Sequence, residues 1–113
     1  MSCLFCEIVA GRIPATVAFQ DDEIMAFLDI KPQAPTHILV IPRKHITSLL
    51  DLTPEDDALI GRVVRRARDL AVDAGLGERG FRLLFNAGED AGYSVYHIHL
   101  HLVGGRKLGW PPG

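Results

Sequence analysis

The stretch from Tyr96 to Val103 reads Tyr-His-Ile-His-Leu-His-Leu-Val, so histidine alternates with aliphatic residues. Side chains alternate between the two faces of a β-strand, and a strand across this stretch would place His97, His99 and His101 on one surface. The chain has only 5 histidines in all. Each imidazole that is removed from water needs a hydrogen-bond partner. Three histidines on one face of a strand are therefore unfavourable unless they serve a function. The row therefore predicts a functional site.

Imidazole chemistry indicates what this site does. A neutral ring is a nucleophile or a general base, and a protonated ring is an acid. Attack on phosphorus with protonation of the leaving group needs these roles together, which favours phosphoryl or nucleotidyl transfer. Alternate histidines would lie about 6.6 Å apart and the outer two about 13 Å apart, too far for one zinc ion to collect all three. Mutual proximity also keeps at least one ring neutral near pH 7.

The loop before the histidines has the composition of a phosphate cradle. Gly92 lets the main chain approach an oxyanion, and the N–H groups and hydroxyl near Ser94 can hold phosphate oxygens. Asn86, at the end of the preceding predicted strand, is a further candidate donor. A plain turn is the alternative interpretation of both the glycines and Asn86.

An antiparallel sheet is predicted to position these residues. Short apolar or β-branched runs between turn-forming residues indicate strands. One helix is predicted to begin near Thr53, whose hydroxyl can cap it, and to end at Gly75. A shorter helical stretch is expected early in the chain, which makes the domain α+β. The predicted strands are 17–20, 24–28, 36–41, 81–85 and 95–103, and the short helix is 5–10.

Composition excludes several classes of protein. The chain has 113 residues and a formal net charge of −2, which describes one domain over 1–113 without a broad basic field. Nucleic acid is therefore not an expected partner, and the four arginines between 62 and 68 are interpreted as a solvated helix face. The sequence shows neither a membrane span nor a signal peptide, so we expect a cytoplasmic protein.

The histidine run resembles the signature of the histidine triad superfamily, and further stretches are similar to its Hint branch, the histidine triad nucleotide-binding proteins. The similar stretches are 27–30, 32–37, 39–42, Lys44–His45, 94–96, 104–106 and 110–113. The resemblance implies a histidine triad fold: a five-stranded antiparallel sheet with one long and one short helix. It also implies a homodimer that joins two sheets, with the tail that carries Trp110 reaching toward the neighbouring site.

The resemblance further implies a purine nucleoside phosphoramidase acting on adenosine 5′-phosphoramidate or aminoacyl adenylates, with no cofactor in the chemistry. His99 would attack the α-phosphorus and form a nucleotidyl-histidine intermediate, and His101 would donate toward the phosphate and the leaving nitrogen. His97 and His37 would set ring orientation and tautomer. Asp29 would bind the ribose hydroxyls, because a carboxylate offers two acceptors to a diol.

Other positions match the family's binding residues. Asn86, Ser94 and Val95 match its phosphate cradle, beside Gly92. Some members bind structural zinc through two cysteines and two histidines, a sound tetrahedral set that Cys3, Cys6, His45 and His97 would supply. His45 also matches a position kept in members without the cysteines. The positions that match the apolar purine pocket, for which ordinary core is the alternative, are Phe5, Ile8, Ile13, Phe27 and Ile30.

Three alternatives stay open at this point. One is a dinucleoside polyphosphate hydrolase of the related Fhit type, which the Hint-like C-terminus disfavours. A second is a nucleotide-binding regulatory module whose catalysis is incidental. In the third the histidine row is itself a metal site. Both adenine and guanine nucleotides are compatible with the sequence.

Overall fold

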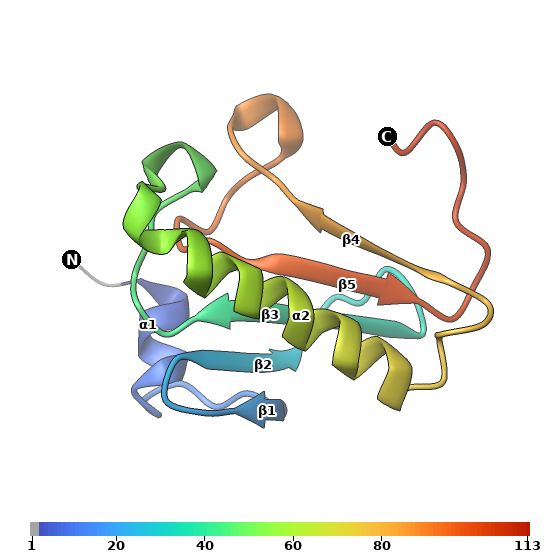
Figure 1. Cartoon of the computed structure of the whole chain (residues 1–113), viewed down its shortest axis with the longest axis horizontal. Coiled ribbons are helices and arrows are strands. Elements are labelled where there is room, and N and C mark those ends of the chain that lie inside the picture. The colour runs from blue at the N-terminus through green and yellow to red at the C-terminus, as the bar shows by residue number, and fades with distance from the viewer. Residues whose placement is uncertain (1–2) are drawn as a thin grey trace.

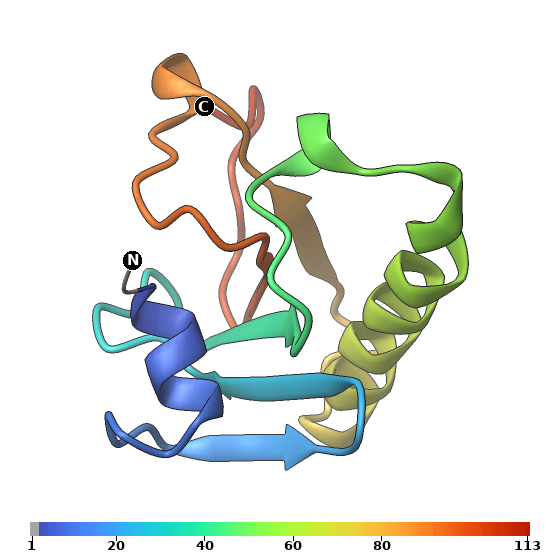
Figure 2. The same ribbon diagram turned by 90° about the vertical axis from the view of Figure 1, so that its left-hand side faces the viewer.

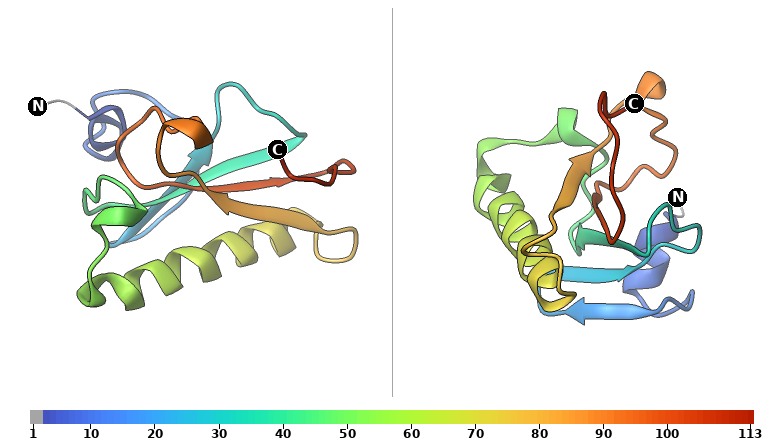
Figure 3. Two further views of the ribbon diagram at one scale, coloured as in Figure 1. Left: turned by 90° about the horizontal axis from the view of Figure 1, so that it is seen from above. Right: turned by 90° about the vertical axis from the view of Figure 1, so that its right-hand side faces the viewer.

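A computed structural model describes residues 3–113 as one five-stranded antiparallel sheet with a helix on each face (Figure 1). The strand order is β1-β2-β3-β5-β4. Figures 2 and 3 show α1 and α2 on opposite sides of this sheet. The α+β architecture agrees with the sequence prediction. The elements are α1 (Leu4–Val9), β1 (Val17–Gln20), β2 (Ile24–Leu28), β3 (Thr36–Pro42), α2 (Asp57–Asp73), β4 (Phe81–Phe85) and β5 (Leu100–Gly104).

The long helix starts and stops where its sequence signals lie. The Asp56 carboxylate accepts the backbone N–H of Thr53 at 3.0 Å and also pairs with Lys44 at 2.7 Å. A 3₁₀ turn over Pro54–Asp56 leads into α2. Gly75 follows the helix with φ of 80°, a left-handed conformation that glycine adopts without strain. Capping and a terminal glycine thus fix the length of α2.

The sheet is buried on both faces, so it carries two apolar clusters. Alternate residues of β2, β3 and β5 face α2 and pack on its buried residues Val63, Ala67 and Ala71. The other face of β2 and β3 packs against α1. The α1-side cluster consists of Phe5, Ile8, Met25, Phe27, Leu39 and Ile41. His101 pairs in register with Leu39, so it lies on the α1 face of the sheet.

The prediction of a strand over 95–103 is wrong in its first half, because β5 begins only at Leu100. Its neighbours β3 and β4 pair with it from Leu100 onward and offer no partner to residues before it. The preceding segment bonds elsewhere: the Ile98 N–H donates to the Ile46 carbonyl at 2.7 Å. Only His101 of the three alternating histidines lies in the strand.

Within residues 3–113, no helix has the length and apolar character needed to cross a membrane.

Candidate active site

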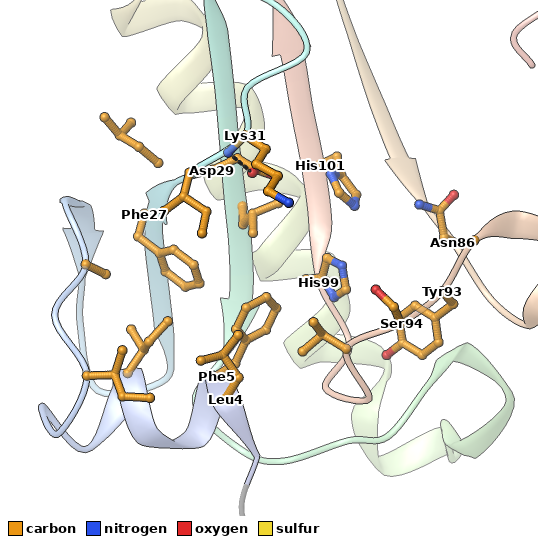
Figure 4. Close-up of a pocket in the computed structure, with 18 of the residues that line it drawn as sticks. Leu4, Phe5, Phe27, Asp29, Lys31, Asn86, Tyr93, Ser94, His99 and His101 are labelled. Carbon is orange, nitrogen blue, oxygen red and sulfur yellow. Dashed lines mark hydrogen bonds between the residues drawn. The ribbon is translucent and has the colours of Figure 1, made fainter.

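A pocket of about 390 Å³ opens on the α1 face of the sheet, a volume that suits a nucleotide-sized ligand. Its walls come from α1, the ends of β2 and β4, and the segment that leads into β5 (Figure 4). Most residues expected at the site lie around it. Among its lining residues are Phe5, Ile8, Ile13, Phe27, Asp29, Ile30, Asn86, Gly92, Ser94, Val95, His99 and His101.

One end of the pocket is apolar. The rings of Phe5 and Phe27 meet edge to face with centroids 5.3 Å apart, and both are buried. Ile13 and Ile30 border the pocket but are not core residues, since Ile30 is 92% exposed. The two touching aromatic rings and the open apolar rim form a wall against which a flat heteroaromatic ring can pack.

The other end is polar. The Asp29 carboxylate accepts the backbone N–H of Lys31 at 2.8 Å, which orients it at the end of β2 (Figure 4). Its second oxygen lies 3.4 Å from Nε2 of His37. Asn86, Ser94 and Tyr93 line the pocket together with His99 and His101, and Figure 4 shows them on the side away from Phe27. A diol beside Asp29 and an anion beside the histidines would both find partners here.

A backbone carbonyl fixes the tautomer of His99. Nδ1 of His99 lies 2.8 Å from the carbonyl oxygen of His97. A carbonyl only accepts, so Nδ1 carries the proton and Nε2 keeps its lone pair. The ring is buried and lines the pocket. His99 therefore presents an unprotonated Nε2 in the pocket, and the backbone of His97 rather than its imidazole sets the tautomer.

His37 and His101 form a second ordered pair. The Gln33 N–H donates to Nδ1 of His37 at 3.0 Å, so the proton of neutral His37 sits on Nε2. That nitrogen lies 2.9 Å from Nδ1 of His101, which must accept. The remaining N–H of His101 is on Nε2, which is buried and has no partner among the described residues. An unpaired donor beside a pocket is a binding group for an anion.

His97 points into a different cluster. Its Nε2 donates to the Pro42 carbonyl at 2.8 Å, which leaves the lone pair on Nδ1. That nitrogen lies 3.5 Å from Sγ of Cys3, 3.5 Å from Sγ of Cys6 and 3.3 Å from Nδ1 of His45. This cysteine–histidine cluster adjoins the pocket through Phe5, whose ring centroid is 6.0 Å from that of His97.

Burial shifts the protonation of the triad. Desolvation lowers the pKa of His97 and of His99, against an opposing hydrogen bond to a carbonyl in each case. Desolvation, with the neighbouring His99 and His37, lowers the pKa of His101 to about 4. All three rings are therefore neutral at pH 7 in the free protein. A neutral ring keeps one nitrogen lone pair, which is the form that a nucleophile or a general base requires.

Comparisons with known proteins agree with this geometry. A family model described as "Scavenger mRNA decapping enzyme C-term binding" matches residues 2–109. The purine nucleoside phosphoramidase of Escherichia coli K12 is 44% identical over 106 residues, which are 94% of this chain and 89% of that protein. A HIT-like protein of Synechocystis is 46% identical over 110 residues, 97% of this chain and 96% of its own. The chain belongs to the histidine triad (HIT) family.

A solved structure extends the likeness to three dimensions. A HIT family hydrolase from Legionella pneumophila matches with a TM-score of 0.98 and 54% identity, over 99% of this chain and 100% of that one. The family and the fold expected from the sequence are thereby confirmed, and the matches place this protein among HIT family hydrolases.

The HIT pocket also differs from the sequence expectations. Trp110 does not line it within one chain and is 82% exposed, so its role in a neighbouring site stays a prediction. Tyr93 and Lys31 line the pocket and were not foreseen. Tyr93 lies in a glycine-containing loop, where composition indicates only a turn. Its burial is set by tertiary contacts that no local pattern reports.

Acid should destabilise this HIT protein through His101. The unfolded ring titrates near 6.5 and the folded ring near 4, so the unfolded state binds more protons in this range and stability falls as pH falls. Because the His101 ring is partly accessible to solvent, we expect the free energy of unfolding to fall by only about 2 kcal/mol between pH 6.5 and pH 4. Urea denaturation at several pH values measures the free energy of unfolding.

His101→Gln is the matched variant, because it keeps a polar side chain that does not titrate. Its unfolding free energy should depend less steeply on pH than that of the wild type over this range. Parallel curves for the two proteins would show that His101 titrates normally.

Proposed function

We propose that this protein is a purine nucleoside phosphoramidase that hydrolyses the P–N bond of adenosine 5′-phosphoramidates, and the P–O bond to the aminoacyl carboxylate in aminoacyl adenylates, through a nucleotidyl intermediate on His99. The observation that carries the proposal is the free Nε2 lone pair of a buried, neutral His99 at the polar end of the pocket. The 44% identity to the Escherichia coli enzyme of that name supports the same substrate class.

The first step forms one bond to phosphorus and breaks another. The purine packs against the apolar wall that Phe5 and Phe27 form, and the ribose diol binds Asp29. Nε2 of His99 attacks the α-phosphorus while the P–N bond breaks and the amine leaves with the bonding electron pair. Asn86, Ser94 and the backbone beyond Gly92 hold the phosphate oxygens. The product is a phosphoramidate bond between His99 and the nucleotide.

The departing amine must gain a proton, and His101 supplies it. An anionic phosphate beside His101 favours the cationic ring, so bound substrate opposes the low pKa that burial imposes on the free protein. The neutral His101 then accepts a proton from the water that attacks the intermediate, and nucleoside 5′-monophosphate leaves. His37 keeps the His101 ring oriented through their 2.9 Å contact. Protons therefore balance over the cycle.

We further propose a structural zinc ion held by Cys3, Cys6, His45 and His97. Tetrahedral zinc with ordinary bond lengths places neighbouring sulfur and nitrogen ligands about 3.3–3.8 Å apart. The four donor atoms lie within 4.8 Å of one another, and the separations between ring nitrogens and thiols are 3.3–3.5 Å. The Pro42 carbonyl orients His97 as second-layer groups do at zinc sites. The donor set thus fits the metal, outside the chemistry.

We also propose a homodimer formed along β4. β4 is one edge of the sheet and its five residues are all half-buried, whereas the opposite edge, β1, is short and irregular in register. The C-terminal tail is anchored beside this edge, because Arg82 donates to the Gly109 carbonyl at 2.9 Å. An unpaired edge of this kind readily extends into a second sheet. Trp110 would then reach the partner's pocket.

His99→Ala should lower turnover of adenosine 5′-phosphoramidate by at least about 10³-fold, because the covalent route needs its nitrogen. The affinity for AMP should change by less than about threefold, since the pocket walls remain. Turnover is followed by chromatography of AMP, and rapid-quench mass spectrometry of the intact wild type should detect one nucleotidyl group on His99.

Undiminished turnover by His99→Ala would remove His99 as the nucleophile. A dinucleoside polyphosphate assayed beside the phosphoramidate tests the Fhit-type alternative, and faster cleavage of the polyphosphate would overturn the substrate class. Tight AMP binding without an adduct on any substrate would instead identify a binding module.

Untagged protein should contain about one zinc ion per chain, and Cys3→Ser with Cys6→Ser should lose it. Elemental analysis measures the metal, and thermal denaturation should show a lower Tm in the double variant. His101→Gln is the control, since it removes an alternate histidine outside the cluster and should keep the zinc. Metal-free wild type, or zinc retained without the thiols, would refute the site.

Sedimentation velocity should give the wild type a mass about twice the 12.4 kDa chain. Leu84→Asp places a charge on the β4 edge and should shift the protein toward the monomer. Val17→Asp makes the same change on β1, the opposite edge, and should leave the dimer intact. A monomeric wild type, or dissociation by the β1 variant alone, would contradict the β4 interface.

A further inference from the structure

Tyr93 gives the nucleophile a flat wall. The rings of Tyr93 and His99 are nearly parallel, 20° apart, with centroids separated by 5.5 Å. Phe5 meets the same imidazole edge to face, at 5.1 Å and 86°. In Figure 4 His99 lies between these two aromatic side chains. Together with the Nδ1 hydrogen bond to its own backbone, these contacts leave the ring little freedom to rotate.

Tyr93 is itself firmly held. Its side chain is buried, and its hydroxyl donates to the Thr47 carbonyl at 2.5 Å. Burial raises the pKa of the phenol to about 12, so it stays a donor at neutral pH. The ring of Tyr96 packs edge to face on Tyr93 at 5.5 Å. Gly92, with φ of 77°, turns the backbone so that Tyr93 enters the pocket wall.

The backbone hydrogen bond alone does not orient His99 fully. A contact at Nδ1 sets the tautomer, but the ring can still tilt about the line through that contact. Tilting would displace Nε2, the atom on the opposite side of the ring, relative to a bound phosphorus. A parallel neighbour that cannot move opposes this tilt, and displacement of reacting atoms by about 1 Å can reduce rates about 100-fold.

We propose that Tyr93 is a positioning residue for the reaction: its ring holds the plane of His99 so that Nε2 faces the α-phosphorus. This role rests on the proposed function of His99. It assigns the ring and the hydroxyl different tasks. The ring contacts the nucleophile, while the hydroxyl anchors the ring to the loop after β3 at Thr47. Loss of the ring should therefore impair chemistry more than binding.

Two variants of Tyr93 separate these tasks. Tyr93→Leu removes the planar wall, and the single-turnover rate of adenylyl transfer to His99 at saturating adenosine 5′-phosphoramidate should fall about 30- to 100-fold. AMP affinity should change by less than about threefold, because the apolar wall at Phe5 and Phe27 and the Asp29 carboxylate are untouched. Tyr93→Phe keeps the ring and should recover most of the wild-type rate. Rapid-quench kinetics and AMP titration measure the two quantities.

Tyr96→Leu is the matched control. It removes an aromatic ring from the same loop, but Tyr96 is 62% exposed and its ring packs on Tyr93. Because the Thr47 hydrogen bond still holds Tyr93 in this variant, we expect its rate to fall by less than about threefold. An equal loss of rate and AMP affinity in Tyr93→Leu, or an unchanged rate, would overturn the positioning role.

Nuclear magnetic resonance gives a readout that does not depend on turnover. In histidine-labelled protein the His99 ring protons should be shifted by the ring current of Tyr93, equally in wild type and Tyr93→Phe, and the shift should disappear in Tyr93→Leu. If the wild type lacks phosphoramidase activity, the proposed function is wrong, but the resonance signals still test the contact between the Tyr93 and His99 rings. Unchanged His99 signals in Tyr93→Leu would refute that contact. Should Tyr93→Leu fail to fold, Tyr93→Met refills the volume without a planar ring.

Discussion

The chemistry available to this protein depends on which nitrogen of each buried histidine carries its proton, and main-chain groups decide this. The His97 carbonyl accepts a hydrogen bond from the Nδ1–H of His99, and the Pro42 carbonyl accepts one from the Nε2–H of His97. The opposite nitrogens are left with lone pairs, one in the pocket and one among the cysteines. At His37 the backbone N–H of Gln33 donates to Nδ1, so Nε2 carries the proton and donates to Nδ1 of His101. The N–H of His101 is then on Nε2 and is free to donate toward the pocket.

The same hydrogen bonds explain why β5 begins only at Leu100. A regular strand through His97 and His99 would use their carbonyls and amides in ladder pairing. Here the His97 carbonyl binds a ring and the Ile98 N–H reaches Ile46. Pro42, which has no N–H to donate to another strand, offers its carbonyl to His97. His97 and His99 can therefore face different surroundings because they lie outside the ladder, which only His101 joins.

Local patterns in the sequence were sufficient for most of the fold and for part of the site. The hairpin β1–β2, β3, β4 and α2 follow from alternation, turn residues and the capping signals at Thr53, all of which act over a few residues. Alternation also predicted that His99 and His101 share one site, and both line the pocket although His99 lies outside the strand. It could not show that His97 turns to the cysteines, because that depends on where the loop carrying His45 passes. The same loop fixes Tyr93 through Thr47, a contact between residues 46 positions apart.

The short helix α1 links the two clusters of histidines. Six residues are too few for a stable isolated helix, so tertiary contacts must hold it in place. Cys3 accepts the Cys6 N–H at its start, and both thiols contact His97. One turn of this helix also carries Phe5 onto His99 and Phe27. Whatever fixes the cysteines therefore also fixes Phe5, and with it part of the apolar pocket wall and one face of the His99 ring. The other face rests on Tyr93, whose anchor at Thr47 lies two residues from His45. Both aromatic neighbours of His99 thus depend on the segments that meet at the cysteine–histidine cluster, so packed rings connect that cluster to the nitrogen that His99 presents to the pocket.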